Sequence, residues 1–217
     1  MQFQIAPSIL AADFLHLEKD IELVNRCGDV IHLDVMDGTL VPNISFGFSV
    51  IDHIAKIAKA PMDVHLMVVH PERWFEKVAS DGVQMCSFHY EAAGRKTSEY
   101  IERIHALGMK AGVAINPDVP VQKLYPYIGK ADYLLVMSVF AGFGGQKFIY
   151  ESLDRVEALR AECIKRGAPD TIIEIDGGIN ASNAATVREA GVNLAVAGSS
   201  VFNSADPAEA IRILRGA

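Results

Sequence analysis

The fold of this chain follows from the stretch Ile31-His32-Leu33-Asp34-Val35-Met36-Asp37-Gly38. Side chains of a strand alternate between its two faces, so His32, Asp34 and Met36 share one face while three apolar side chains fill the other. A strand that is buried on both faces is normally apolar throughout. A buried histidine and aspartate are unfavourable unless each has a partner or a metal ion, so this strand is the first indication of an active site.

Strand and helix patterns alternate on both sides of this stretch. Strands are expected at 5–10, 31–36, 62–68, 83–89, 110–115, 133–137, 171–175 and 194–197, and helices at 13–26 (with Asp13 as N-cap), 50–58, from 71, 97–107, 121–127, 151–166, 184–190 and 208–214. Strict alternation favours parallel strands with right-handed helical crossovers. Eight such units in 217 residues have the size of a compact (β/α)8 barrel. We therefore predict an α/β protein, a single (β/α)8 TIM barrel that forms one domain over residues 1–217.

A doubly wound open sheet is the alternative architecture. A dinucleotide-binding fold of that kind places a GxGxxG motif after its first strand, and this sequence has none there. Its glycine-rich segments instead follow the sixth, seventh and eighth expected strands. The barrel is therefore the preferred interpretation.

Composition excludes several classes of protein. Half of the residues are hydrophobic and 22% are charged, which is ordinary for a globular chain, and the formal net charge of −7 argues against nucleic-acid or anionic-membrane partners. An anionic substrate remains possible, because backbone amides can bind phosphate. The three cysteines are widely spaced and are expected to be reduced. No secretory leader or membrane span is expected, so the protein is predicted to be cytoplasmic.

Polar residues gather at the expected carboxyl ends of the strands, where such barrels carry their active sites. They are Ser8, His32, Asp34, His65, Asn116 and Asp176. Two histidines and two aspartates at one mouth suit a divalent ion such as Zn2+, Fe2+, Co2+ or Mn2+. A lone histidine would more often be a hydrogen-bonded core residue, but two carboxylates buried together without a cation would raise at least one pKa. Asp37 falls on the outward face and is expected to hold the turn at Gly38.

Three glycine-rich segments follow consecutive strands: Gly142-Phe143-Gly144-Gly145, Gly177-Gly178 and Gly198-Ser199-Ser200. Glycine lets backbone amides approach an anion closely, and the loops after the last two strands are the usual phosphate site of this fold. A metal ion beside two carboxylates and a phosphate site indicates proton abstraction next to a carbonyl. With one carboxylate on each side of the substrate, the reaction would invert a carbon.

The chain resembles the ribulose-phosphate 3-epimerase family along nearly its whole length. The matching motifs are Ala6-Pro7-Ser8-Ile9-Leu10-Ala11-Ala12-Asp13-Phe14, His32-Leu33-Asp34-Val35-Met36-Asp37-Gly38, Val41-Pro42-Asn43 with Phe46-Gly47, Asp63-Val64-His65-Leu66-Met67, Gly142-Phe143-Gly144-Gly145-Gln146-Lys147-Phe148, Asp176-Gly177-Gly178-Ile179 and Ala197-Gly198-Ser199. The resemblance implies a cytosolic, metal-dependent isomerase that interconverts D-ribulose 5-phosphate and D-xylulose 5-phosphate.

The resemblance also implies roles for individual residues. One divalent ion per subunit would be held by His32, Asp34, His65 and Asp176, with Asp34 and Asp176 as the acid/base pair. Ser8 and His65 would contact the substrate, and the glycine loops would bind its phosphate through Gly142, Phe143, Gly144, Gly145, Gly177, Gly178, Gly198 and Ser199. Met36, Met67 and Met137 would line the site, although an inward methionine is more often core filling. The expected partner is a small ketose phosphate, and the expected assembly is a homo-oligomer.

Some interpretations stay open. The family usually has a proline directly before the first glycine loop, where this chain has Phe140-Ala141. Allulose 6-phosphate 3-epimerases are related, so a hexulose phosphate is an alternative substrate. A phosphosugar-binding barrel without catalysis is the alternative from a different class. His89 and Glu91 could orient groups behind the metal ligands or could equally face solvent.

Overall fold

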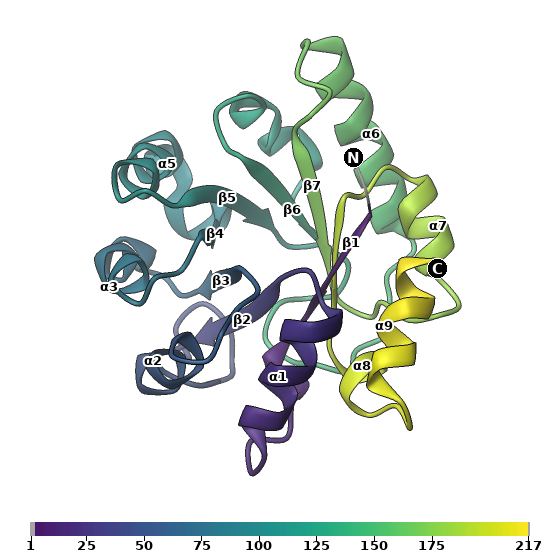
Figure 1. The fold of residues 1–217 in the computed structure, drawn as a ribbon. Coiled ribbons are helices and arrows are strands. Elements are labelled where there is room, and N and C mark those ends of the chain that lie inside the picture. The colour runs from purple at the N-terminus through teal and green to yellow at the C-terminus, as the bar shows by residue number, and fades with distance from the viewer. Residues whose placement is uncertain (1–2, 217) are drawn as a thin grey trace.

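A computed structural model describes residues 3–216 as eight parallel strands surrounded by helices (Figure 1). The strands are β1 (Gln4–Pro7), β2 (Ile31–Met36), β3 (Met62–Met67), β4 (Met85–His89), β5 (Lys110–Ile115), β6 (Tyr133–Met137), β7 (Ile172–Asp176) and β8 (Leu194–Ala197). Each of β2 to β7 pairs with the next strand in sequence, and β1 pairs with β8. Between β1 and β2 only the bridge Ser8–His32 forms among the described residues, so the barrel is nearly closed. The predicted (β/α)8 barrel is confirmed, and the doubly wound sheet is wrong.

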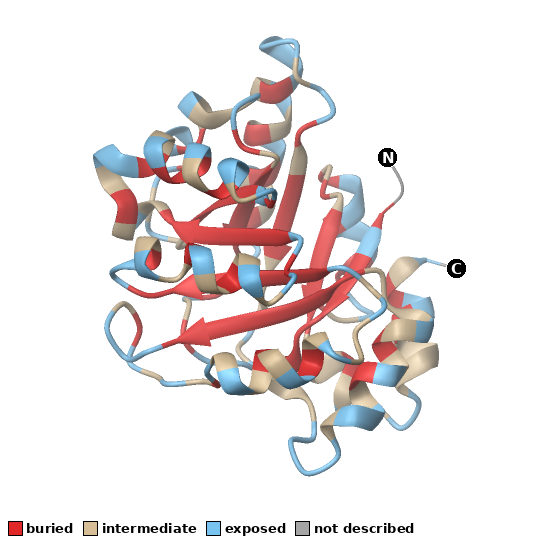
Figure 2. Cartoon of the chain, turned by 60° about the vertical axis from the view of Figure 1, so that its left-hand side comes forward, coloured by how far each residue is buried: buried red, intermediate tan, exposed pale blue. Residues whose placement is uncertain are grey.

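The helices lie outside the strands, as Figure 1 shows. They are α1 (Leu17–Cys27), α2 (Phe48–Ala55), α3 (Phe75–Ser80), α4 (Tyr90–Ala93), α5 (Thr97–Ala106), α6 (Glu151–Lys165), α7 (Ala184–Glu189), α8 (Ser199–Phe202) and α9 (Pro207–Arg215), with 3-10 turns η1 (Ile9–Ala11), η2 (Pro71–Arg73), η3 (Gly94–Lys96), η4 (Val121–Lys123) and η5 (Tyr125–Tyr127). The strands are almost entirely buried, while the helices turn buried residues inward and exposed residues outward (Figure 2). In the part of the chain from 3 to 216, no helix is long and apolar enough to cross a membrane.

Several expected elements differ from the structure. The helix expected from Pro71 begins as the 3-10 turn η2, and α3 starts only at Phe75. Asp13 does not cap the first helix, because α1 begins at Leu17; the Asp13 side chain instead accepts a hydrogen bond from the amide of Leu15. The first strand ends at Pro7, and η1 takes the place of its last residues. The helix expected at 121–127 is two 3-10 turns, because Pro126 interrupts the segment and cannot donate a helical hydrogen bond.

Alternation along the strands separates the apolar residues outside the barrel from those inside it. The outward residues, such as Ile31 and Leu33 of β2, join the main core between strands and helices. A second cluster includes Met85, Tyr133 and Leu194, which begin β4, β6 and β8, so it fills the amino-terminal end of the barrel. The inward residues Asp34, His65 and Asp176 lie farther along β2, β3 and β7, toward the carboxyl ends of these strands.

Candidate active site and metal centre

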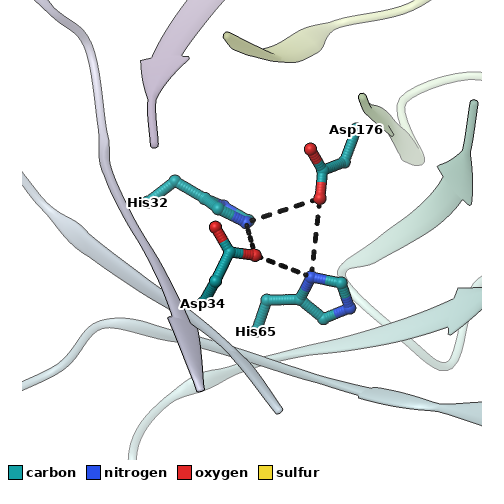
Figure 3. Close-up of side chains that lie close together, drawn as sticks. All are labelled: His32, Asp34, His65 and Asp176. Carbon is teal, nitrogen blue, oxygen red and sulfur yellow. Dashed lines mark ion pairs between the residues drawn. The ribbon is translucent and has the colours of Figure 1, made fainter. Parts of the chain in front are cut away.

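Four side chains from three strands meet inside the barrel near its carboxyl end (Figure 3). His32 and Asp34 lie on β2, His65 on β3 directly opposite Asp34 in the strand register, and Asp176 at the end of β7. His32 Nε2 is 3.4 Å from Asp34 Oδ1 and 3.9 Å from Asp176 Oδ2. His65 Nδ1 is 3.5 Å and 3.6 Å from the same two oxygens. The two carboxylates therefore occupy opposite corners of a four-sided group, with a histidine between them on each side.

The donor atoms of this cluster fit a divalent cation. One nitrogen or oxygen from each residue lies within 4.8 Å of all the others. His32 Nε2 and His65 Nδ1 are buried and have no hydrogen-bond partner among the described residues. Buried polar atoms without a partner are unusual, and two imidazole nitrogens with two carboxylate oxygens are the ligand type of Zn2+ and similar ions. The cluster could thus hold one metal ion.

The pKa shifts of the cluster residues also fit a bound cation. Burial alone lowers the pKa of His32, but the neighbouring carboxylates of Asp34 and Asp63 outweigh burial and raise it well above its usual value. Burial also lowers the pKa of His65, and Asp176 and Asp34 reverse the shift. Burial raises the pKa of Asp34, yet the two imidazoles bring it far below its usual range. The cluster therefore keeps the Asp34 carboxylate charged and attracts positive charge, either protons on the rings or a metal ion.

Ser8 contacts one of the carboxylates directly. Its hydroxyl donates a 2.6 Å hydrogen bond to Asp34 Oδ2, the oxygen that does not face the histidines. Ser8 follows β1 and bridges to His32, so barrel closure places it there. A donor at this oxygen orients the carboxylate and favours its charged form.

A buried group behind His32 was not predicted from the sequence. His32 Nδ1 lies 2.9 Å from Asp63 Oδ2 and 3.6 Å from Glu174 Oε1, and the Tyr133 hydroxyl donates a 2.6 Å hydrogen bond to Asp63 Oδ1. Burial and the nearby Asp63 carboxylate raise the pKa of Glu174 well above its usual value. The sequence did contain a signal for this group. Asp63 and Glu174 precede His65 and Asp176 by two positions each, so strand alternation places their side chains on the same inward face.

His89 supports the other imidazole. It ends β4, is fully buried, and its Nε2 lies 3.0 Å from Nε2 of His65. Glu91 lies behind it, with Oε1 3.4 Å from His89 Nδ1. Burial lowers the pKa of His89. The solvent-facing interpretation of His89 is therefore wrong.

A cavity of about 440 Å3 opens above the four-residue cluster. Its wall includes Ser8, Asp34, Asp176, the three inward methionines Met36, Met67 and Met137, and the glycine loops through Gly142, Phe143, Gly144, Gly145, Gly177, Gly178, Gly198 and Ser199. His32 and His65 are fully buried and are not part of this wall. The two carboxylates thus join the buried cluster to the space where a small molecule could bind.

The glycine loops form the side of the cavity near β6, β7 and β8. Gly177 and Gly178 have φ values of +117° and +68°, which disfavour other residues. A Cβ on Gly178 would come within 2.6 Å of the Phe148 backbone nitrogen, so the two loops pack backbone against backbone. The Ala141 amide donates a 3.0 Å hydrogen bond to Asn116 Oδ1. The proline usual at this position could not make that bond.

Solved structures of several enzymes have the same fold as this chain. A 3-hexulose-6-phosphate synthase superposes with a TM-score of 0.70 at 18% identity and covers 100% of this chain and 99% of its own. A mutant tryptophan synthase α-subunit from Pyrococcus furiosus gives 0.70 at 12% identity, over 98% of this chain and 95% of its own. At these identities the similarity concerns the fold alone.

Similarity in sequence, unlike similarity in fold, identifies one protein family. Ribulose-phosphate 3-epimerase of Synechocystis sp. is 45% identical over 216 residues, covering 97% of this chain and 92% of the relative. The Bacillus subtilis protein of the same name is 42% identical over 214 residues and is covered to 98%, as is this chain. The sequence model described as the Ribulose-phosphate 3 epimerase family matches residues 4–202. This chain belongs to the ribulose-phosphate 3-epimerase family.

Proposed function

We propose that this protein is a metal-dependent epimerase that interconverts D-ribulose 5-phosphate and D-xylulose 5-phosphate at C3. One observation carries the proposal: the carboxylates of Asp34 and Asp176 approach a single cavity from β2 and β7, with two buried imidazoles between them. Family membership identifies the class of substrate. The ribulose-phosphate 3-epimerases of Synechocystis sp. and Bacillus subtilis do not favour the alternative of an allulose 6-phosphate enzyme.

The metal ligands in this proposal are His32, Asp34, His65 and Asp176. Their mixed nitrogen and oxygen donors suit Zn2+, Fe2+, Co2+ or Mn2+. When bound, the ion would supply positive charge that stabilises the negative charge developing on the substrate's oxygens. Both histidines are fully buried, and each ring is held by a partner on the side away from the ion: His32 by Asp63 and His65 by His89. The ligands are therefore in place before the ion binds.

Asp34 and Asp176 are the proposed acid/base pair. One carboxylate removes the proton from C3 on one face of the substrate, leaving an enediolate, and the other delivers a proton to the opposite face. In the reverse direction the two exchange roles. No net proton is gained or lost, and the configuration at C3 is inverted. The Ser8 hydroxyl assists by holding Asp34 through its 2.6 Å hydrogen bond.

The substrate phosphate is placed against the glycine loops. Backbone amides there, together with the amino end of the segment from Gly198, provide donors without a cationic side chain. Met36, Met67 and Met137 give the cavity an apolar surface near the carboxylates. Such a surface excludes water from the reacting carbon while leaving the hydroxyl groups of the sugar free to reach polar partners.

The proposal also covers the protein's compartment, assembly and partners. We place it in the cytoplasm as a homo-oligomer of single-domain subunits, acting on a small ketose phosphate without a nucleic-acid or membrane partner. A curated relative from rice bears the name of a cytoplasmic isoform, which supports the compartment.

The experiment is an epimerase assay on protein stripped of metal and reloaded separately with Zn2+, Fe2+, Co2+ or Mn2+. Ribulose 5-phosphate and allulose 6-phosphate are compared at each metal. We expect a higher kcat/KM for the pentulose phosphate and little activity in the stripped protein. A higher kcat/KM for allulose 6-phosphate would overturn the substrate, and full activity after stripping would overturn the metal requirement.

A further inference from the structure

His65 and His89 form a direct contact between two buried imidazoles. Their Nε2 atoms lie 3.0 Å apart, and the rings are nearly parallel, with centroids 5.0 Å apart and an angle of 16° between planes. Both side chains are fully buried, so neither nitrogen reaches water. A contact at this distance requires that one Nε2 carries a proton and that the other offers a lone pair.

The direction of this hydrogen bond follows from the other side of His65. Its Nδ1 faces the carboxylates of the metal cluster and has no hydrogen-bond partner among the described residues. A ring nitrogen that binds a metal ion must offer its lone pair, so the proton of a neutral His65 is on Nε2. His65 is then the donor and His89 Nε2 the acceptor, which places the proton of His89 on Nδ1.

Glu91 is arranged to favour that tautomer of His89. Glu91 Oε1 lies 3.4 Å from His89 Nδ1 and is an acceptor in that direction. The same oxygen receives hydrogen bonds of 2.9 Å from both the backbone amide and the side-chain amide of Asn116. Asn116 Nδ2 lies 3.5 Å from His89 Nδ1 but only 2.9 Å from Glu91 Oε1, so its shorter hydrogen bond goes to Glu91 and holds the carboxylate beside His89.

We infer that His89 is a positioning residue that keeps the lone pair of His65 Nδ1 directed at the metal cluster. This inference rests on the proposed metal site. Without His89, the carboxylates 3.5 Å and 3.6 Å from His65 Nδ1 would favour a proton on that nitrogen, which is the tautomer that cannot bind a metal ion. His32 has a carboxylate in the equivalent place, Asp63, at 2.9 Å. At His65 the neutral ring of His89 occupies the corresponding place, and Glu91 lies on the far side of that ring.

Two substitutions separate hydrogen bonding from packing. His89→Leu fills a similar volume without an acceptor or donor, whereas His89→Gln keeps an oxygen that can accept from His65 and an amide that can donate to Glu91. Co2+ affinity is measured for each purified protein by competition with a chromophoric chelator, alongside thermal unfolding of the metal-free form. We expect His89→Leu to bind Co2+ about 10 to 100-fold more weakly than the wild type, and His89→Gln to recover most of the loss. The control is His53→Leu, an exposed histidine on α2, with unchanged affinity.

A second measurement needs no variant. In the Zn2+-loaded wild type, long-range 1H–15N NMR of the histidine rings should show His65 protonated on Nε2 and His89 protonated on Nδ1. The opposite tautomer of His89, or Co2+ binding by His89→Leu as tight as that of the wild type, would overturn the inference. Equal weakening in the Leu and Gln variants would also overturn it, since packing would then explain the effect. A wild-type protein that binds no Co2+ would instead overturn the metal site itself, and the inference with it.

Discussion

The two-carboxylate proposal makes its sharpest prediction for Asp176→Asn. Asparagine has nearly the volume of aspartate, and the replaced side chain is 14% exposed at the cavity wall rather than packed in the core. The substitution therefore removes a base and a negative charge with little change of packing. We expect the free energy of unfolding of the metal-free protein to change by no more than about 1 kcal/mol.

The expected loss of activity is far larger than the change in stability. A positioned acid or base contributes about 100 to 10,000-fold to the rate, which corresponds to roughly 3 to 5 kcal/mol of transition-state free energy. Asp176 is also one of four proposed metal ligands, so the assay is run with saturating metal ion and the bound metal is measured. Under these conditions we expect epimerisation to fall by about 1,000-fold or more.

Exchange with solvent then tests the geometry. Each single variant keeps the carboxylate on one face of the substrate, so each should exchange the C3 proton of only one epimer with D2O and form little of the other. Asp176→Asn and Asp34→Asn should be selective for opposite epimers, as followed by NMR at C3.

The matched control is Asp37→Asn, because Asp37 is an exposed acid just beyond β2 whose carboxylate accepts hydrogen bonds from Thr39 in the loop. It should keep wild-type turnover. Normal epimerisation by metal-loaded Asp176→Asn, or exchange of both epimers by one single variant, would refute the assignment of one carboxylate to each face.

Three further predictions concern separate parts of the site. Ser8→Ala removes the hydrogen bond to Asp34 and should lower kcat about 10-fold or more, measured in the coupled epimerase assay; an unchanged kcat would contradict the role of that hydroxyl. Burial raises the pKa of Glu174 above its unfolded value near 4.5, so ionising it opposes folding and stability falls as the pH rises above that value. Glu174→Gln should therefore gain stability relative to the wild type between pH 5 and pH 8 in urea unfolding of metal-free protein, and the opposite trend would refute the shift. Gly177→Ala would overlap a valine side chain at φ +117° and should lose more than about 1 kcal/mol of stability. Gly144→Ala, whose Cβ would make an ordinary 3.9 Å contact with Leu10, should be nearly neutral by the same measurement.

Strand periodicity made much of this molecule predictable. The inward positions of β2 could be read from His32, Asp34 and Met36 alone, because period-two alternation does not depend on the rest of the fold. The alternation of strands and helices then placed residues from distant strands at one end of a barrel. The exposed Asp37 and the inward methionines follow from the same rule.

Contacts that depend on register between distant strands were not predictable. Asp63 was visible as an inward residue, but its contact with Tyr133, 70 positions away, requires the stagger of four strands around the barrel. The meeting of His65 with His89 likewise depends on the register of β3 and β4. The helix start at Leu17 was missed for a local reason: Asp13 satisfies a turn in the loop, and propensity cannot distinguish that turn from a helix cap.

The central claim is that this chain inverts C3 of a ketopentose phosphate by removing and returning a proton. The most direct test is to incubate the metal-loaded wild-type protein with D-ribulose 5-phosphate in D2O and to follow the C3 position by 1H NMR. The account predicts that D-xylulose 5-phosphate forms and that it carries deuterium at C3. Absence of xylulose 5-phosphate, or its formation with the original C3 proton fully retained at equilibrium, would contradict the account.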